Sequence, residues 1–240
     1  MAGSGGAVLT VEELHTAYGL SRVLFGVSLH IGAGECVCLL GRNGVGKTTT
    51  MRSIMGLTPA ASGRIVWKGR NITRQEPFRV AELGLGFVPE DRRIFADLTV
   101  LENLAVGRQP ARAGVPHWTQ ERVFDLFPNL AALRDRAGGR MSGGEQQMLT
   151  IARTLMGNPE LLLLDEPSEG LAPLVVEHLR QQIARLKAGG QTILLAEQNV
   201  EFSLSLADRV YVLEKGHIRY EGTAREFRED ETIRRRYLAL

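Results

Sequence analysis

Positions 41–48 of the chain read Gly41-Arg42-Asn43-Gly44-Val45-Gly46-Lys47-Thr48, which fits the pattern G-x-x-x-x-G-K-[ST]. The segment lies between an apolar run that ends at Leu40 and a helical pattern predicted over residues 48–55. Glycines let successive backbone N–H groups and a positive helix N-terminus face an anion, while Lys47 reaches the β and γ phosphate oxygens and Thr48 binds Mg²⁺. A glycine-rich loop without function is the alternative, but the position between a strand and a helix favours a bound nucleoside triphosphate.

Short apolar runs and longer helical patterns alternate on both sides of this loop. Residues 8–14 and 27–31 alternate apolar and polar side chains, which predicts half-buried strands, whereas residues 35–40 are nearly all apolar and predict a central strand. Two further apolar runs, at 161–164 and 192–196, each precede an acidic residue. We expect the strands up to residue 40 to form a mixed sheet, and the apolar strands joined by helices to form a parallel sheet, which is an α/β fold.

Length and composition predict a globular chain, long enough for one large domain or two small ones. The chain has 240 residues, of which 44% are apolar and 23% charged, and a formal net charge of +2 gives no argument for a polyanionic partner. Apolar residues with helical spacing between about 91 and 159 predict a helical insert. The expected parts are a disordered tail at 1–6, a core at about 7–90 and 160–225, a helical subdomain at about 91–159 and a C-terminal helix at about 224–240.

Neither a membrane span nor a signal peptide is expected. No apolar run approaches the ~18–20 residues that a membrane-spanning helix requires. Residues 1–6 have neither the basic flank nor the apolar centre of a signal peptide. We therefore expect the chain to stay in the cytosol.

An acidic pair follows the apolar run at 161–164. Asp165 and Glu166 resemble a Walker B segment, in which Asp165 would hold Mg²⁺ and Glu166 would orient or deprotonate the attacking water. A buried strand that ends in two surface acids is a common alternative. The phosphate-binding loop in the same chain favours the functional interpretation.

The segment Met141-Ser142-Gly143-Gly144-Glu145-Gln146-Gln147 precedes a helix that we expect over residues 148–156. Ser142 and Glu145 have the spacing of a capping box, which would start this helix without any ligand. Two glycines beside a helix N-terminus also present bare N–H groups to an anion. The segment is therefore compatible with both a structural and an anion-binding role.

These three motifs, in this order, resemble the ATP-binding cassette of ABC transporters, and the resemblance covers residues 8–222. It implies a P-loop NTPase core with a mixed or parallel sheet, an N-terminal antiparallel β part and a helical subdomain. It also implies ATP and Mg²⁺ as cofactors and hydrolysis of ATP to ADP and phosphate, coupled to transport. Residues 168–173 resemble the D-loop, which contacts the opposite subunit; an ordinary strand-to-helix loop is the alternative.

Single positions extend the resemblance to the nucleotide. Tyr18 resembles the aromatic residue that stacks on adenine, although a surface tyrosine is the alternative. The nucleotide-binding residues that the resemblance implies are Tyr18, Gly41, Asn43, Gly44, Gly46, Lys47, Thr48, Thr49, Ser142, Gly143 and Gly144.

Two positions depart from the general pattern of the family. Glu90 stands where cassettes usually carry Gln, and Gln198 stands where they usually carry His. Both residues are similar to those of one of the two ATPase subunits of branched-chain amino-acid importers. The resemblance implies that Glu166, Gln198 and Glu90 are catalytic and that Thr48, Glu90 and Asp165 bind the metal. Because Gln198 carries no charge and Glu90 adds negative charge near Mg²⁺, we expect slow turnover at this site.

The resemblance also implies partners. Ser142 and Gly144 would complete the site of a facing subunit, so we expect a heterodimer with a different cassette, or a homodimer in isolation, on two membrane permease subunits at the cytoplasmic face of the cell membrane. A solute-binding receptor would act indirectly, and no nucleic acid is expected.

Other functions are open at the level of sequence. Importers of urea or short amides resemble this subfamily closely. Soluble ABC ATPases that act on DNA or ribosomes resemble two fused cassettes or a cassette split by a coiled coil, and 240 residues without sustained heptads fit neither. A P-loop kinase would leave residues 142–144 unexplained.

Overall fold

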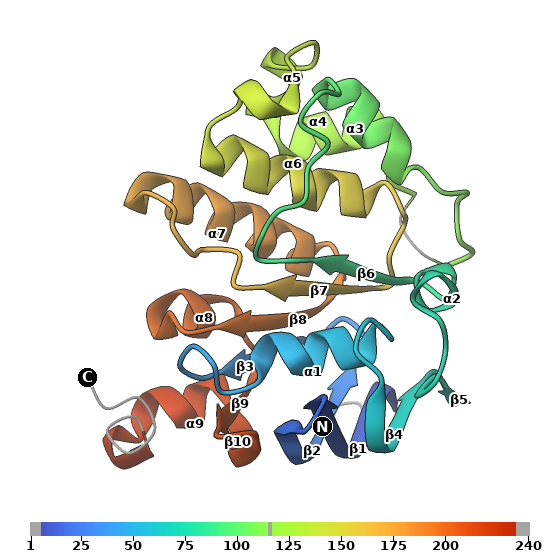
Figure 1. The fold of residues 1–240 in the computed structure, drawn as a ribbon. Coiled ribbons are helices and arrows are strands. Elements are labelled where there is room, and N and C mark those ends of the chain that lie inside the picture. The colour runs from blue at the N-terminus through green and yellow to red at the C-terminus, as the bar shows by residue number, and fades with distance from the viewer. Residues whose placement is uncertain (1–5, 115–116, 234–240) are drawn as a thin grey trace.

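Parallel pairing of buried strands forms the centre of the fold (Figure 1). In the computed structural model, which describes residues 6–114 and 117–233, one sheet has the strand order β10-β9-β3-β8-β7-β6. Only β10 pairs antiparallel with its neighbour among the described strands of this sheet. Its strands are β3 (Cys36–Leu40), β6 (Leu85–Val88), β7 (Leu161–Asp165), β8 (Thr192–Glu197), β9 (Arg209–Glu214) and β10 (His217–Thr223). The expected α/β class is confirmed.

A second, antiparallel sheet is built from the N-terminal part of the chain. Its order is β2-β1-β4-β5, with β1 (Ala7–Tyr18), β2 (Ser21–Gly32), β4 (Ala60–Trp67) and β5 (Arg70–Asn71). The expectation that the strands up to residue 40 share one mixed sheet is therefore wrong. Strand β2 buries alternate residues and can face water on one side, whereas β3 is buried at every position and needs neighbours on both sides.

Helices cover the sheets and extend beyond the β6 edge (Figure 1). Helix α1 lies between the two sheets and contacts β2, β7 and β8. It begins one residue before the predicted start. The helices are α1 (Lys47–Ile54), α2 (Pro77–Glu82), α3 (Val100–Gly107), α4 (Gln120–Leu126), α5 (Pro128–Ala132), the 3₁₀ turn η1 (Gly138–Arg140), α6 (Gly143–Leu155), α7 (Pro173–Ala188), α8 (Val200–Leu206) and α9 (Ala224–Glu229). Within the described ranges, none of them has the length and apolarity to cross a bilayer.

The two faces of the central sheet belong to two separate hydrophobic cores. In β7, Leu162 and Leu164 pack in the core shared with α6 and α7, whereas Leu161 and Leu163 pack in the core shared with α1 and the antiparallel sheet. All four leucines are fully buried, and each contributes about 1.5–3 kcal/mol of transfer free energy. The continuous apolar pattern of these strands is therefore a consequence of burial on both faces.

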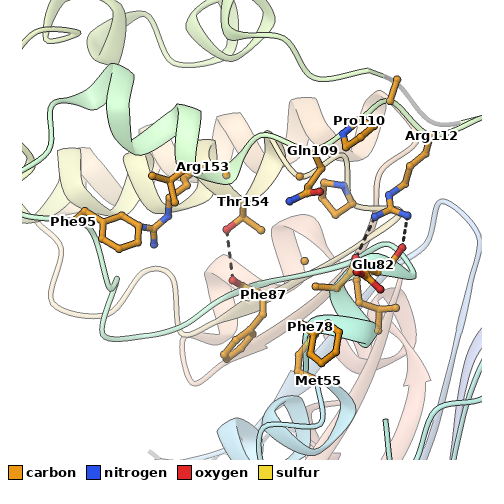
Figure 2. Close-up of a pocket in the computed structure, with 18 residues that line it drawn as sticks. Met55, Phe78, Glu82, Phe87, Phe95, Gln109, Pro110, Arg112, Arg153 and Thr154 are labelled. Carbon is orange, nitrogen blue, oxygen red and sulfur yellow. Dashed lines mark hydrogen bonds between the residues drawn. The ribbon is translucent and has the colours of Figure 1, made fainter. Parts of the chain in front are cut away.

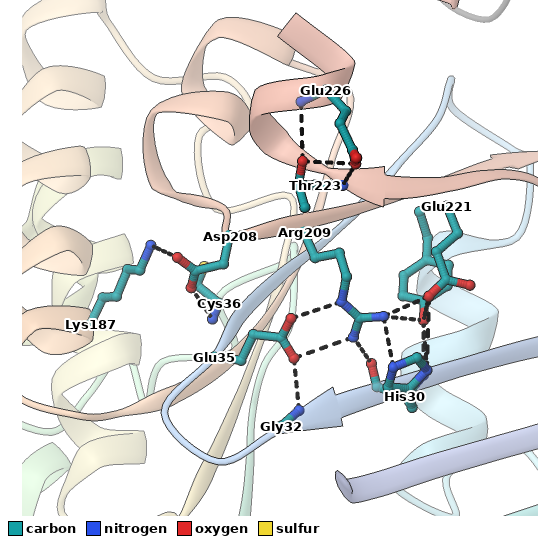
Figure 3. Close-up of polar contacts among 11 residues, drawn as sticks. His30, Gly32, Glu35, Cys36, Lys187, Asp208, Arg209, Glu221, Thr223 and Glu226 are labelled. Carbon is teal, nitrogen blue, oxygen red and sulfur yellow. Dashed lines mark hydrogen bonds and ion pairs between the residues drawn. The ribbon is translucent and has the colours of Figure 1, made fainter. Parts of the chain in front are cut away.

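A polar cluster centred on Arg209 ties the two sheets together at the end remote from the phosphate-binding loop (Figure 3). The Arg209 guanidinium donates to Glu35 Oε1 at 2.8 Å, to Glu221 Oε1 at 2.6 Å and to the carbonyl oxygen of His30. Glu35 Oε2 also accepts the Gly32 N–H at 2.7 Å. Burial raises the pKa of the adjacent Tyr211 hydroxyl to about 12. These bonds fix the turn between β2 and β3.

Two expected terminal segments extend beyond the described residues. Of the tail predicted at 1–6, residues 1–5 lie outside the described ranges, as do residues 234–240 of the predicted C-terminal helix. The described part corrects that helix, because α9 ends at Glu229 instead of continuing. Asp230 leaves the helical conformation, and its Oδ1 accepts the N–H groups of Thr232 and Ile233, which starts a new turn.

Candidate functional site

The parallel register brings the ends of four strands to one edge of the central sheet. Leu40 of β3 pairs with Glu197 of β8, and β7 ends beside β8 at Asp165. The neighbouring β6 ends at Val88, two residues before Glu90. The phosphate-binding loop and the acidic residues after the other three strands therefore meet at this edge.

Close packing leaves no room for side chains at two glycines of the phosphate-binding loop. Gly46, the N-cap of α1, has a φ of 114°, and a Cβ there would lie 2.7 Å from Leu24 Cδ2. A Cβ at Gly41 would lie 2.5 Å from the carbonyl oxygen of Leu213. The loop is thus held between β2 and β9, and its backbone forms a wall of a cavity of about 250 Å³. The lining residues are Val23, Gly44, Gly46, Lys47, Thr48, Thr49 and Glu166.

Lys47 is a buried cation held by the loop and by Glu166. Its Nζ donates to the carbonyl oxygens of Gly41 at 2.7 Å and Arg42 at 2.8 Å, and it lies 2.9 Å from Glu166 Oε1. The two side chains are 3% and 5% exposed. Phosphate oxygens in the cavity would compete with Glu166 for this ammonium group.

The backbone of Glu166 does not have the extended conformation of a strand. Its φ of 44° lies in the left-handed region, a conformation that costs of order 1–3 kcal/mol in a residue with a side chain. With the Asn43 amide assigned so that its nitrogen faces the carboxylate, that nitrogen lies 3.0 Å from Oε1. This strained backbone turns the carboxylate toward the phosphate-binding loop.

The residues at this edge fit a divalent cation. Thr48 Oγ1 donates to Asp165 Oδ1 at 3.1 Å, and Asp165 Oδ2 is buried without a hydrogen-bond partner among the described residues. Burial raises the pKa of the Asp165 carboxyl to about 6, with a smaller contribution from the charges of Glu166 and Glu90. An oxygen-rich set with one unpartnered carboxylate oxygen is the type of site that Mg²⁺ prefers.

A further acid, Glu169, lies against Glu166. Its backbone N–H donates to the Glu166 carbonyl oxygen at 3.1 Å, and its Oε2 is buried without a partner in the described part of the chain. A side-chain hydrogen bond with Glu166, followed by burial, raises the pKa of the Glu169 carboxyl to about 7. Sequence analysis placed Glu169 only in the segment that resembles the D-loop, because its contact with Glu166 depends on the turn after β7.

Gln198 follows β8, and the residue before it is a buried carboxylate that sequence analysis missed. Glu197 is 1% exposed, whereas Gln198 is exposed at the same sheet edge. Burial raises the pKa of the Glu197 carboxyl, and hydrogen bonds from Ser168 and Asn199 act in the opposite direction. The sequence signal that could have indicated this buried carboxylate is an acidic residue at the end of a wholly apolar strand.

Helix α6 begins earlier than predicted. It starts at Gly143 instead of residue 148, so both glycines lie in its first turn. The predicted capping box is confirmed, because Ser142 Oγ accepts the Glu145 N–H at 3.4 Å and Glu145 Oε2 accepts the Ser142 N–H at 2.7 Å. This cap outweighs the low helix propensity of glycine. A Cβ at Gly144 would lie 2.5 Å from Val175 Cγ1, so the first turn of α6 packs closely on α7.

Not all of the predicted site residues lie together. Among the described residues, no hydrogen bond or ion pair joins residues 142–144 to the phosphate-binding loop. Tyr18 is 47% exposed, does not line the 250 Å³ cavity, and places its hydroxyl 3.4 Å from Thr58 Oγ1. One chain thus contains the phosphate-binding loop with its acids, and a separate helix N-terminus.

A larger hollow of about 780 Å³ lies between α2, β6 and α6 (Figure 2). Phe78, Phe95 and Val106 expose apolar surface to it. Arg153 and Arg112 also line it, and Arg153 Nη1 and Arg112 Nε are buried without a partner among the described residues. This surface, which we call the groove, combines apolar area with two incompletely paired cations.

Comparisons with known proteins agree with this geometry. A profile of the ABC transporter family matches residues 24–169. The chain is 40% identical over 231 residues to the high-affinity branched-chain amino acid transport ATP-binding protein BraG of Pseudomonas aeruginosa, which covers 96% of this chain and 99% of that protein. It is 36% identical over 234 residues to the lipopolysaccharide export system ATP-binding protein LptB of Escherichia coli (strain K12), with 97% of each covered. The crystal structure of the ADP conformation of an ATP-binding cassette of an ABC transporter has a TM-score of 0.81 at 28% identity, covering 98% of this chain and 100% of that chain.

Replacement of Lys47 by alanine should weaken ATP binding about 10–100-fold, because charge-assisted hydrogen bonds to phosphate are each worth about 1.5–3 kcal/mol. Isothermal titration of the isolated chain with ATP measures this change. Lys68→Ala is the control, because Lys68 pairs with Glu160 on the surface away from the cavity. Equal ATP affinity in Lys47→Ala and wild type would contradict the placement of phosphate at Lys47.

Replacement of Glu166 by glutamine should separate binding from turnover. The substitution removes the ion pair with Lys47 that a nucleotide must break, so ATP affinity should equal or exceed that of wild type. The loss of a positioned base should lower the hydrolysis rate by ~10²–10⁴. Phosphate release and ATP titration on the same preparation give both values, and hydrolysis at the wild-type rate would place the base elsewhere.

Proposed function

Since this chain belongs to the family of ABC transporter ATP-binding subunits, which bind ATP and hydrolyse it to power transport, we propose that it energises an importer of branched-chain amino acids. The observation that carries the choice of solute is the pair Glu90 and Gln198 at the sheet edge, which is similar to one ATPase subunit of such importers. The identity of 40% with BraG, whose name specifies branched-chain amino acids, supports the same choice. LptB, at 36%, makes export of lipopolysaccharide the alternative to exclude.

At the chain's own site, each residue has a distinct part in hydrolysis. The loop N–H groups and Lys47 bind the β and γ phosphates, and the triphosphate displaces Glu166 from Lys47. The freed Glu166 carboxylate accepts a proton from the water that attacks the γ phosphorus. Gln198 donates an amide hydrogen bond to the γ-phosphate but supplies no charge, so turnover is slow.

Bound Mg²⁺ would neutralise charge on the phosphate oxygens. Thr48 and Asp165 would hold it, because they are already joined by a hydrogen bond and one Asp165 oxygen is unpartnered in the described part of the chain. Glu90 comes from the adjacent strand end and would complete the acidic side.

The separation of residues 142–144 from the phosphate-binding loop supports a composite site. The capped N-terminus of α6 is suited to a phosphate that this chain's own loop does not hold. We infer that Ser142 and Gly144 complete the site of a facing cassette, which completes this one in return. Since Gln198 is uncharged, the facing cassette is a different chain, and the working ATPase is a heterodimer.

The groove supplies a place for a membrane permease subunit. Its exposed Phe78, Phe95 and Val106 would bury apolar side chains of a permease helix. The guanidinium groups of Arg112 and Arg153 would donate hydrogen bonds to an acidic residue of that helix. Docking there places the chain at the cytoplasmic face of the membrane.

Ser142→Arg should abolish the ATPase activity of the assembled complex, because a bulky cation fills the position that faces the partner's phosphates. ATP binding by the isolated chain should survive, since Ser142 is separate from the phosphate-binding loop. Hydrolysis is measured against protein concentration, with and without the partner cassette and permease subunits.

A control separates the loss of a helix cap from the loss of the composite site. Thr223 caps α9 with the same capping box, so Thr223→Arg should lose the usual ~1 kcal/mol of cap stability but retain ATPase activity. Full activity in a dilute monomer, or in the assembled Ser142→Arg complex, would exclude a shared site.

The choice of solute is tested with the transporter reconstituted in liposomes. A receptor loaded with leucine, isoleucine or valine should stimulate ATP hydrolysis, whereas urea, acetamide and lipopolysaccharide should not. Arg153→Glu is the matched control, because it should bind ATP normally but fail to copurify with the permease. Stimulation by urea or acetamide, or by lipopolysaccharide alone, would replace the proposed solute with that one.

A further inference from the structure

The buried carboxylate of Glu197 joins two separate segments of the site. Its Oε1 accepts the Ser168 N–H at 3.1 Å, and its Oε2 accepts the N–H groups of Gln198 and Asn199, each at 3.2 Å. Ser168 begins the D-loop at residues 168–173, and Gln198 is the residue proposed to contact the γ-phosphate. Glu197 lies 29 residues after Ser168 in the sequence, and its one side chain therefore joins the backbone of two distant segments.

The same contacts argue against a direct catalytic part for Glu197. Both oxygens face backbone N–H groups, and the residue is 1% exposed, so it presents no free oxygen to a nucleotide or water. No described lysine or arginine forms an ion pair with it. Three N–H donors, together with the Ser168 side chain, thus compensate the burial of this carboxylate.

Local hydrogen bonds restrain both of the segments that Glu197 joins, the D-loop and the start of α8. Leu171 N–H donates to the Ser168 carbonyl oxygen at 3.4 Å, which closes the D-loop on itself. On the other side, Asn199 Oδ1 accepts the Phe202 N–H at 3.0 Å and caps α8. A movement of the D-loop would therefore displace the Glu197 carboxylate through Oε1. Its other oxygen, Oε2, binds the N–H groups of Gln198 and Asn199, so the backbone at Gln198 would move with it.

We propose that Glu197 is a positioning residue that couples the D-loop, and through it the facing cassette, to the γ-phosphate contact of Gln198. The proposal rests on the composite site of the proposed function. Association of the two cassettes displaces the D-loop, and Glu197 converts that displacement into the orientation of Gln198. Hydrolysis at one site thereby depends on occupancy of the interface.

A carboxylate is needed at this position because N–H donors face both of its oxygens. In Glu197→Gln the amide oxygen can accept hydrogen bonds either from Ser168 or from Gln198 and Asn199, but not from both. The amide NH₂ group must then face an N–H donor at the other position. The amide oxygen should stay with Gln198 and Asn199, which together offer two N–H donors, so the hydrogen bond from the Ser168 N–H should be lost. Glu197→Asp keeps two acceptor oxygens, although the side chain is shorter.

The first measurement is ATP hydrolysis by the complex of this chain, its partner cassette and the permease. Glu197→Gln should lower kcat about 10–100-fold, as expected for misplacement of a reacting group, while the Kd for ATP of the isolated chain stays within about twofold of wild type. Glu197→Asp should regain part of the rate. A space-filling role predicts the reverse order, since glutamine is the better match in size.

The second measurement is amide hydrogen exchange in the isolated chain, followed by NMR. Glu197→Gln should accelerate exchange at Ser168 more than at Gln198, and leave the N–H groups of α1 unchanged. The control is Glu35→Gln, which also removes a carboxylate bonded to a backbone N–H but lies in the Arg209 cluster (Figure 3). It should lower the thermal midpoint without changing kcat at temperatures where the chain is folded.

Different outcomes would contradict the coupling through Glu197 and the composite site on which it rests. Wild-type kcat in Glu197→Gln, unchanged exchange at Ser168, or a parallel loss of kcat and ATP affinity would overturn the coupling. If wild-type chain gains no activity on assembly with its partners, the composite site itself is wrong.

Discussion

Backbone hydrogen bonding in strands that are buried on both faces is the constraint on which this structure depends. Every residue of β3, β7 and β8 is buried, so water cannot pair with their N–H and C=O groups, and neighbouring strands must do so. The parallel register that satisfies these groups also fixes where each strand ends. The phosphate-binding loop and the acids at 165–166 and 197 lie together because the sheet pairs in this way.

The features that the sequence predicted are those encoded within one short segment. The phosphate-binding loop, the acids after β7 and the capping box at Ser142 each carry their own physical signal. Strands β9 and β10 were not assigned, because their burial depends on partners elsewhere in the chain. The contact of Glu197 with Ser168 was missed for the same reason, since it exists only after β7 and β8 have paired.

Helix α6 connects the two surfaces that we propose contact partner subunits. Its first turn contains the two glycines after Ser142, and Arg153 near its other end lines the groove. A helix of 13 residues is about 20 Å long, and it joins these two surfaces by one continuous segment. A displacement of the groove by a permease helix would therefore reposition residues 142–144 at the facing cassette, without any change within the helix itself.

The buried ion pair between Lys47 and Glu166 opposes the binding of any nucleotide whose phosphates take the Lys47 ammonium group. A triphosphate must separate Lys47 from Glu166, so the free energy of this buried ion pair lowers the affinity of the chain for ATP. In this pair the proposed general base is the counter-ion of Lys47, and binding of the phosphates of ATP would free it to act on water.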